Sequence, residues 1–185
     1  KKDKCLIVLT SIPRYSFKLY CEPISKQFSR YIDDQILFIN SLSQEIRESL
    51  IIRDMPVEYG WSIKSRLKDL QPNLRFSDIN DSMMSNSKQS RIIICTYNST
   101  TFLETFKNNM PTLIFWDIRY YEIREDAFEN FNDLINAGIF HTSPKSAASF
   151  LIKNWNNIDK WWYAETTQKV VNNFSKKFAK KITNK

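Results

Sequence analysis

A run of small polar residues between an apolar strand and a helix is the part of this chain best suited to hold an anion. Residues 92–95 read Ile-Ile-Ile-Cys and predict a buried strand, and the polar turn that follows opens a helix. In parallel sheets, ligands bind beyond the carboxyl ends of strands, where N–H groups at a helix N-terminus point outward unpaired. The residues of this turn that we predict to bind phosphate are Asn98, Ser99, Thr100 and Thr101. Ordinary helix capping is the alternative, and no glycine-rich phosphate-binding motif accompanies them.

Two arginines follow other apolar strands in the same way. Arg53 comes directly after residues 50–52, and Ser11 and Arg14 come after the first strand. Because the carboxyl ends of parallel strands meet at one edge of a sheet, we expect these side chains near the polar turn. A guanidinium group can hold phosphate oxygens or a sugar carboxylate through paired hydrogen bonds. For both arginines the alternative is a surface ion pair.

A second group of residues is predicted to contact a base or a sugar. A Tyr-Gly-Trp segment and a lysine follow the second strand, and a tryptophan and a glutamate frame the loop after residues 112–116. In sequence order these residues are Tyr59, Gly60, Trp61, Lys64, Trp116 and Glu122. For the aromatic residues the alternative is packing, and for Glu122 it is a place at the start of a helix. No nucleophile and base at convincing spacing and no P-loop appear, so the catalytic residues stay unassigned.

The formal net charge of +7 is carried by the two ends of the chain. Residues 164–185 hold six lysines and one glutamate, and residues 1–4 hold three lysines and one aspartate, which leaves residues 5–163 neutral. A nucleic-acid-binding domain needs a basic stripe across its folded face. We therefore predict no nucleic-acid partner.

The three cysteines and the single histidine give no metal-binding pattern, and we predict no metal site. Cys5 and Cys95 lie in apolar strands, where a free cysteine is usually part of the core, and Cys21 lies in a polar loop. An odd number of cysteines at such places predicts a reduced protein in the cytoplasm. No apolar run approaches the roughly 20 residues of a membrane span, and no signal peptide is visible. The chain opens Lys-Lys-Asp-Lys with no initiator Met, so we expect a piece of a longer protein or a processed terminus.

The pattern of apolar residues predicts one α/β domain with a parallel sheet covered by helices on both faces. Strands are predicted at 5–10, 50–53, 74–76, 92–95, 112–116 and 138–140. Helices are predicted at 31–50, 61–70, after the polar turn, at 122–137 and at 144–155. The helix at 122–137 carries Phe128 and Ile135 on its apolar face and ends before Gly138 at the C′ position. Residues 11–29 are predicted to form a loop, and residues 81–90 either a helix or a loop.

Residues 164–185 are predicted to form a basic amphipathic helix after a main domain that spans residues 1–163. Val170, Phe174, Phe178 and Ile182 recur at every fourth position, and lysines lie on the other faces. The helix is predicted to pack on its own domain or on a neighbouring, amino-terminal one. Attraction to an anionic membrane surface is the alternative.

Several motifs of the chain resemble those in the carboxyl-terminal half of a family of bacterial surface-carbohydrate transferases. The central motifs are Thr96–Glu104, Met110–Thr112 and Ile114–Asp117. The others are Ser11–Tyr15, Ile52–Arg53, Tyr59–Trp61, Gly138–His141, Pro144–Ala148 and Trp161–Trp162. The resemblance covers most of the chain and is weak at residues 17–50 and 79–90.

This resemblance implies a glycosyltransferase of the GT-B type, in which two Rossmann-like domains face each other across a cleft. The chain would be the carboxyl-terminal domain, which binds the nucleotide-sugar donor without a metal ion or another cofactor. The amino-terminal domain, absent here, would bind the saccharide or lipid-linked acceptor and supply the catalytic base. Glu104 would accept hydrogen bonds from the ribose hydroxyls of the donor. Alternatively, Thr101 and Glu104 form a capping box at the start of their helix.

We therefore expect the chain to be the donor-binding part of a glycosyltransferase that builds bacterial surface polysaccharide, and to be inactive by itself. It would act in the cytoplasm, at the inner face of the membrane. The alternative function is a non-catalytic Rossmann-like module that docks a partner protein or a membrane surface through its apolar edges and its basic tail.

Overall fold

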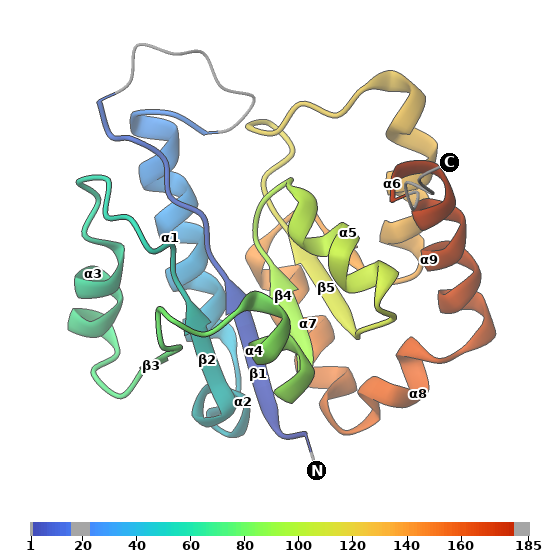
Figure 1. The fold of residues 1–185 in the computed structure, drawn as a ribbon, viewed down its shortest axis with the longest axis horizontal. Coiled ribbons are helices and arrows are strands. Elements are labelled where there is room, and N and C mark those ends of the chain that lie inside the picture. The colour runs from blue at the N-terminus through green and yellow to red at the C-terminus, as the bar shows by residue number, and fades with distance from the viewer. Residues whose placement is uncertain (1, 16–22, 180–185) are drawn as a thin grey trace.

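A parallel sheet forms the centre of the structure, a computed structural model that describes residues 2–15 and 23–179 (Figure 1). Its strands, counted over these residues, are β1 (Lys4–Val8), β2 (Leu50–Arg53), β3 (Arg75–Phe76), β4 (Ser90–Cys95), β5 (Thr112–Phe115) and β6 (Phe140–His141). All neighbouring strands are parallel, in the order β3-β2-β1-β4-β5-β6. The order changes direction between β1 and β4, as in Rossmann-like folds. The predicted α/β fold with a Rossmann-like parallel sheet is confirmed.

Helices connect the strands and cover both faces of the sheet (Figure 1). They are α1 (Lys26–Ser41), α2 (Gln44–Ser49), α3 (Ile63–Leu70), α4 (Met83–Gln89), α5 (Thr100–Lys107), α6 (Phe128–Asn136), α7 (Pro144–Asn154), α8 (Ile158–Trp162) and α9 (Glu165–Phe178). Short 3₁₀ turns, η1 (Glu125–Ala127) and η2 (Trp155–Asn157), precede α6 and α8.

Alternate residues of each strand point to opposite faces of the sheet and enter two separate hydrophobic cores. In β1, Cys5 and Ile7 lie in the core shared with α1, α2, α3 and α7, whereas Leu6 and Val8 lie in the core shared with α5, α6 and α9. The strands are therefore apolar at nearly every position. This is why the four longer strands, β1, β2, β4 and β5, are recognisable in the sequence as largely continuous apolar runs.

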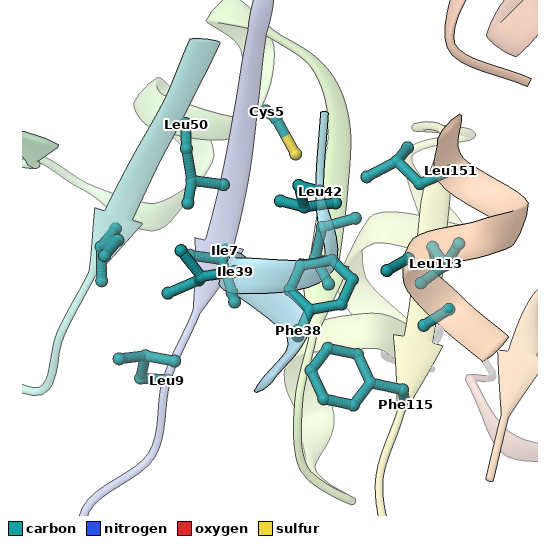
Figure 2. Packing of buried hydrophobic residues seen from close by; sticks show 14 of the residues in the cluster. Cys5, Ile7, Leu9, Phe38, Ile39, Leu42, Leu50, Leu113, Phe115 and Leu151 are labelled. Carbon is teal, nitrogen blue, oxygen red and sulfur yellow. The ribbon is translucent and has the colours of Figure 1, made fainter. Parts of the chain in front are cut away.

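Figure 2 shows the core on the α1 side of the sheet. Phe38 of α1 stacks on Phe115 of β5, with 4.7 Å between the ring centroids. Ile39 and Leu42 extend the same layer toward β1, and Leu151 contributes from α7. These side chains hold α1 and α7 on this face of the sheet.

The cysteines of the described residues lie one in each core. Cys5 belongs to the core on the α1 side and Cys95 to the core on the α9 side, and both are fully buried. Burial raises the pKa of the Cys5 thiol to about 12 and also raises the pKa of Cys95. Both thiols therefore stay protonated, and unreactive, in the folded protein at neutral pH. Cys21 lies outside the described residues.

The apolar side of α9 packs on the domain of the same chain. Phe174 lies against Phe102 and Phe106 of α5, with ring centroids 6.0 and 5.9 Å away. The last part of the predicted tail helix, which includes Ile182, lies outside the described residues. Within residues 2–15 and 23–179, no helix has the length and apolar character needed to cross a bilayer.

The prediction of a single helix at 31–50 is wrong, because two helices, α1 and α2, occupy this segment. Leu42 adopts an extended conformation after α1, which itself begins earlier than predicted, at Lys26. Ser43 then caps α2 by accepting a hydrogen bond from the Ile46 backbone N–H at 3.5 Å. A serine side chain competes for backbone N–H groups and so favours a new helix start at this point.

The helix predicted from residue 122 begins later than expected. Residues 125–127 form η1, and α6 starts at Phe128. Phe128 and Ile135 were predicted on the apolar face but are 49% and 41% exposed, because Phe131 and Leu134 define the buried side of the helix.

Two other helix ends carry the capping residues that were predicted, and a third capping residue decides between helix and loop at residues 81–90. Gly138 follows α6 with φ +71°, and a Cβ there would lie only 2.4 Å from the Phe150 ring. Ser143 caps α7 by accepting a hydrogen bond from the Ser146 backbone N–H at 3.3 Å. Ser82 caps α4, so most of the segment 81–90 is a helix and not a loop, and Ser90 already begins β4.

Replacing Phe38 by alanine tests the packing of α1 on the sheet. Loss of a ring that is fully buried and stacked on Phe115 is expected to lower the free energy of unfolding by about 3–5 kcal/mol, measured by urea denaturation. Leu37→Ala, at a neighbouring position that is 37% exposed, is the control and should cost about 0.5 kcal/mol. Equal losses in the two variants would contradict the described orientation of α1.

Candidate functional site

The carboxyl ends of three neighbouring strands lie level with one another at one edge of the sheet. Val8, at the end of β1, is in register with both Arg53 of β2 and Cys95 of β4. The loops after these strands therefore leave the sheet side by side. The change in strand direction falls between β1 and β4, which is where folds of this kind bind their ligands. The predicted phosphate-binding residues lie at these strand ends, on these loops or in α5, the helix that follows one of them.

A buried hydroxyl network joins the loop after β1 to the loop after β4. The Tyr31 hydroxyl of α1 accepts a hydrogen bond from the Thr10 backbone N–H at 2.9 Å and lies 2.7 Å from Thr96 Oγ1. Thr96 Oγ1 donates to the Val8 carbonyl at 2.8 Å, so the Tyr31 hydroxyl is the donor toward Thr96. Burial raises the pKa of Tyr31, and its hydroxyl keeps the proton that this network needs.

The polar turn after β4 leads into α5 with Ser99 as its N-cap. The Ser99 hydroxyl accepts a hydrogen bond from the Thr101 backbone N–H at 3.4 Å, and the Tyr97 hydroxyl lies 3.1 Å from Thr101 Oγ1. Asn98 and Ser99 are half-buried, whereas Thr100 is exposed in the first turn of the helix. Ser99 thus serves as a helix cap, and Thr100 is the residue of this turn most open to a ligand.

The predicted capping box between Thr101 and Glu104 is wrong. That motif requires Thr101 to be the N-cap, but Ser99 takes this position and Glu104 lies exposed in the second turn of α5. Several residues of the turn are able to cap a helix, and the sequence alone does not select among them. With Ser99 as the N-cap, the Thr101 hydroxyl instead contacts the Tyr97 hydroxyl.

A cavity of ≈ 350 Å³ opens at the same edge, between the loops after β1, β2 and β3 and the start of α3. Its volume lies in the range of small-molecule sites. Three predicted residues, Ser11, Arg53 and Lys64, line it. Asp54 and Ser77 also line it and were missed. Asp54 could have been found, because it directly follows an apolar strand, whereas Ser77 follows a two-residue strand that carries no strong pattern.

Two of the charged residues that line this cavity, Asp54 and Lys64, influence each other. Burial raises the pKa of the Asp54 carboxyl, and the charge of Lys64 opposes part of that increase. Lys64 also lies 5.1 Å from the centre of the Phe76 ring. Arg53 reaches from the cavity toward α4, where its Nη1 donates to the Asn86 side-chain oxygen at 3.1 Å once the amide is oriented to satisfy its neighbours.

Glu58 closes the turn that precedes α3. Its carboxylate accepts hydrogen bonds from the backbone N–H groups of Gly60, Trp61 and Ser62 at 2.7–2.8 Å. These bonds, with the Ser62 N–H contributing most, hold the pKa of Glu58 below its usual range. A protein carboxylate thus already satisfies N–H groups that a bound anion could otherwise have used.

Arg14, Tyr59, Gly60 and Trp61 hold two loops together and do not line the cavity. The Arg14 backbone N–H donates to the Tyr59 carbonyl at 3.1 Å, and its Nη1 donates to the Gly60 carbonyl at 2.9 Å. The guanidinium lies 5.3 Å from the Trp61 ring, and Trp61 Nε1 donates to the Ile12 carbonyl at 2.8 Å. Trp61 is buried, so its ring is not free to stack on a base or a sugar.

The remaining predicted contacts, Trp116 and Glu122, are not part of the cavity. Trp116 is 2% exposed, and its ring packs against Phe140 with 4.6 Å between centroids. Glu122 is exposed in the segment between β5 and η1. Trp116 is therefore a core residue.

A second group of charges lies where β5 ends. Asp117 pairs with Arg119 at 2.5 Å, and this contact holds the pKa of Asp117 below its usual range. Asp34 of α1 has its pKa raised to about 6, first by burial and then by the negative charges of Asp117 and Asp33. The positive charges of Arg119 and Arg30 oppose this increase.

The single histidine has a structural role beside α7. His141 Nδ1 lies 2.8 Å from Ser146 Oγ, and its Nε2 lies 3.1 Å from the Gly138 carbonyl. Burial lowers the pKa of His141, and a neutral ring donates from Nε2 to the carbonyl while Nδ1 accepts from the serine hydroxyl. In the part of the chain that the structure describes, no three His, Cys, Asp or Glu side chains gather to hold a metal ion.

Tyr31→Phe tests the hydroxyl network at the strand ends. Without this hydroxyl the buried Thr10 N–H loses its acceptor, so we expect the free energy of unfolding to fall by about 1–3 kcal/mol. Tyr163→Phe removes a hydroxyl from a residue that is 55% exposed and is the control. Chemical denaturation of both variants is the measurement, and an unchanged stability in Tyr31→Phe would contradict the network.

Asp34→Asn tests the environment of the Asp34 carboxyl. Because the pKa of Asp34 in the folded protein, about 6, lies above the ordinary aspartate value of 3.8, the folded protein binds more protons between these two pH values. Wild-type stability therefore declines as pH rises through this window, and Asp34→Asn removes that decline. Denaturation curves from pH 4 to 8 are expected to show a growing advantage of Asp34→Asn up to about pH 6, constant above it. The exposed Asp133→Asn on α6 is the control, and parallel curves for all three proteins would contradict the assignment.

Comparison with known protein families places the chain in one of them. The model of a family described as LIC12162 family transferase matches residues 1–185, the full length of the chain. No curated protein and no solved structure is similar enough to count as a match. The match covers the whole chain. The ligand-sized cavity at the carboxyl edge of its Rossmann-like sheet is consistent with a transferase. The chain belongs to the LIC12162 family of transferases.

Proposed function

We propose that this chain binds the nucleotide-sugar donor of a GT-B-type glycosyltransferase that builds bacterial surface polysaccharide. The observation that carries the proposal is the meeting of two features at one sheet edge. A hydroxyl-rich turn with Thr100 exposed opens α5 after β4, and a ≈ 350 Å³ cavity lies beyond β1, β2 and β3. A nucleotide-sugar has a diphosphate or phosphate and two bulky polar ends, and it needs a site of this composite kind.

The polar turn is the proposed phosphate-binding part of the site. Asn98, Ser99 and Thr100 lie at the N-terminus of α5, where the helix dipole and the first backbone N–H groups favour an anion. Donors fixed in this way would also stabilise the negative charge that forms on a leaving phosphate. Arg53, which lines the cavity on the other side of β1, supplies a positive charge to the same edge.

The rest of the reaction is assigned to groups outside this chain. The acceptor, a saccharide or a lipid-linked sugar, and the catalytic base would belong to a second domain that closes over the carboxyl edge. The donor would be held without a metal ion, by hydroxyls, backbone N–H groups and Arg53. We place the enzyme in the cytoplasm at the inner face of the membrane, where surface polysaccharide precursors are built.

The alternative function as a docking module has less support from this structure. This alternative relies on the apolar edges of the module and on its basic tail. Val171 and Phe174 of α9 are buried against the domain of the same chain, and Lys177 donates to the Asp126 carbonyl at 2.6 Å. The described part of this helix therefore offers little free apolar surface to a membrane or a partner.

Thr100→Val combined with Arg53→Ala tests the donor-binding proposal. Loss of a hydroxyl and of a charged donor is expected to weaken nucleotide binding roughly ten- to hundredfold. The measurement is calorimetric titration with UDP, GDP, CDP and CMP, each with magnesium and with a chelator. Binding of one of these nucleotides to the wild type, unaffected by the chelator, is expected.

Thr166→Val combined with Arg124→Ala is the matched control. Thr166 is exposed in the first turn of α9 as Thr100 is in α5, and Arg124 is exposed in an ion pair with Asp126. This variant should bind like the wild type, and thermal melting should show that both variants are folded. Wild-type affinity in the Thr100 and Arg53 variant would refute the assignment of the site.

A further inference from the structure

The cavity beyond β1, β2 and β3 has a charge balance that does not suit a phosphate. Two cationic residues and three carboxylates line it, and the carboxylates are Asp54, Glu58 and Asp78. A phosphate-binding site usually has an excess of positive charge or free backbone N–H groups. Here the net charge of the lining is negative, so a neutral group that donates hydrogen bonds fits it better than an anion.

Two of the three carboxylates already have several hydrogen-bond donors. Glu58 accepts the three backbone N–H groups at the start of α3. Asp78 Oδ1 accepts from the backbone and side-chain N–H groups of Asn80 at 2.8 and 3.0 Å. These two side chains therefore shape loops, and both are exposed to water.

Asp54 is different, because its carboxylate is partly shielded from the water that could otherwise satisfy an oxygen without a protein donor. Its Oδ1 accepts from the Met55 backbone N–H at 2.8 Å, and among the described residues no hydrogen bond reaches Oδ2. The side chain is half-buried at the end of β2, and burial raises its pKa. A partly desolvated carboxylate with a free oxygen gains most from a ligand that brings its own donors.

The other polar groups around Asp54 are small hydroxyls. Ser11, Ser62, Ser65 and Ser77 line the cavity from three different segments, with Ser62 and Ser65 both at the start of α3. The apolar wall includes Ile63 and Phe76. Hydroxyl groups that both donate and accept, beside an apolar wall, match a sugar ring with its polar rim and its C–H face.

We propose that this cavity binds the polyhydroxylated part of the ligand, a ribose or a hexose, and that Asp54 accepts hydrogen bonds from its neighbouring hydroxyl groups. The proposal rests on the proposed function and divides the site in two. The anionic part of the donor lies on the turn before α5, and a sugar lies beyond β2 and β3. Asp54 is then a specificity-determining residue, since a ligand without these hydroxyls leaves its carboxylate unpaired.

The rival occupant is a phosphate held at the N-terminus of α3. The two occupants give opposite results in Asp54→Asn. If a phosphate lies in the cavity, removal of a negative charge tightens its binding. If hydroxyl groups lie there, loss of a charged acceptor weakens binding roughly tenfold or more.

The experiment compares wild type, Asp54→Asn and Asp69→Asn in two assays. Asp69 is exposed on α3 outside the cavity, so its variant controls for the loss of one carboxylate. Calorimetry uses UDP, GDP and CDP with their 2′,3′-dideoxy counterparts. Ligand-observed NMR uses free ribose, glucose, galactose and N-acetylglucosamine. Thermal melting shows that each variant is folded.

Two results support the proposal. Weaker binding of the ribonucleotide to Asp54→Asn, with unchanged binding of its dideoxy counterpart, assigns the ribose to the cavity. Loss of the monosaccharide signal in Asp54→Asn assigns the transferred sugar to it. In both cases Asp69→Asn should behave as the wild type.

The remaining results overturn one proposal or both. Tighter diphosphate binding in Asp54→Asn, or no effect of this substitution in either assay, overturns the sugar assignment and leaves the nucleotide site intact. Monosaccharide binding that depends on Asp54, with no nucleotide bound by the wild type, overturns the nucleotide-sugar function and keeps the cavity assignment. Absence of binding in both assays overturns both.

Discussion

The central strand β1 is buried on both faces and paired on both edges, and the arrangement of the whole domain depends on this. A shift of one residue in its register would move Cys5 and Ile7 from one core to the other. The same register sets Val8 level with Arg53 and Cys95. The packing of the two cores therefore also fixes where the three loops of the candidate site leave the sheet. The location of the candidate site follows from the core, even though loops supply most of its residues.

The backbone polar groups of the loops at this edge need hydrogen-bond partners outside the sheet. Two side chains supply them. Tyr31 brings a hydroxyl from α1 to the Thr10 N–H and to Thr96, so the loops on both sides of the switch between β1 and β4 share one anchor. Glu58 satisfies the turn before α3. Fixed loops pay little conformational entropy when a ligand binds. Asp54 stands out at this edge because it is half-buried and, among the residues that the structure describes, no donor reaches its second oxygen.

Much of the fold could be predicted, because strands of a buried parallel sheet are continuous apolar runs and helix ends carry residues such as Gly138 and Ser143. The same logic led from strand ends to Ser11 and Arg53, which line the cavity. The rest depends on contacts between distant segments. Ser77 reaches the cavity only because β3 pairs with β2. A tryptophan such as Trp61 or Trp116 looks the same in a sequence whether it faces a ligand or the core, and both are buried.

The two buried cysteines give this domain an internal reporter of its own motions. Cys5 and Cys95 lie on adjacent strands but face opposite cores, so each thiol is shielded by a different layer of helices. A thiol reacts only when its layer opens and the thiolate can form. In a Cys21→Ser background, the labelling rate of Cys5 would follow the opening of the α1 layer, and that of Cys95 the opening of the α9 layer. The same sheet thus allows the fluctuations of its two sides to be timed separately, with no probe introduced into the site.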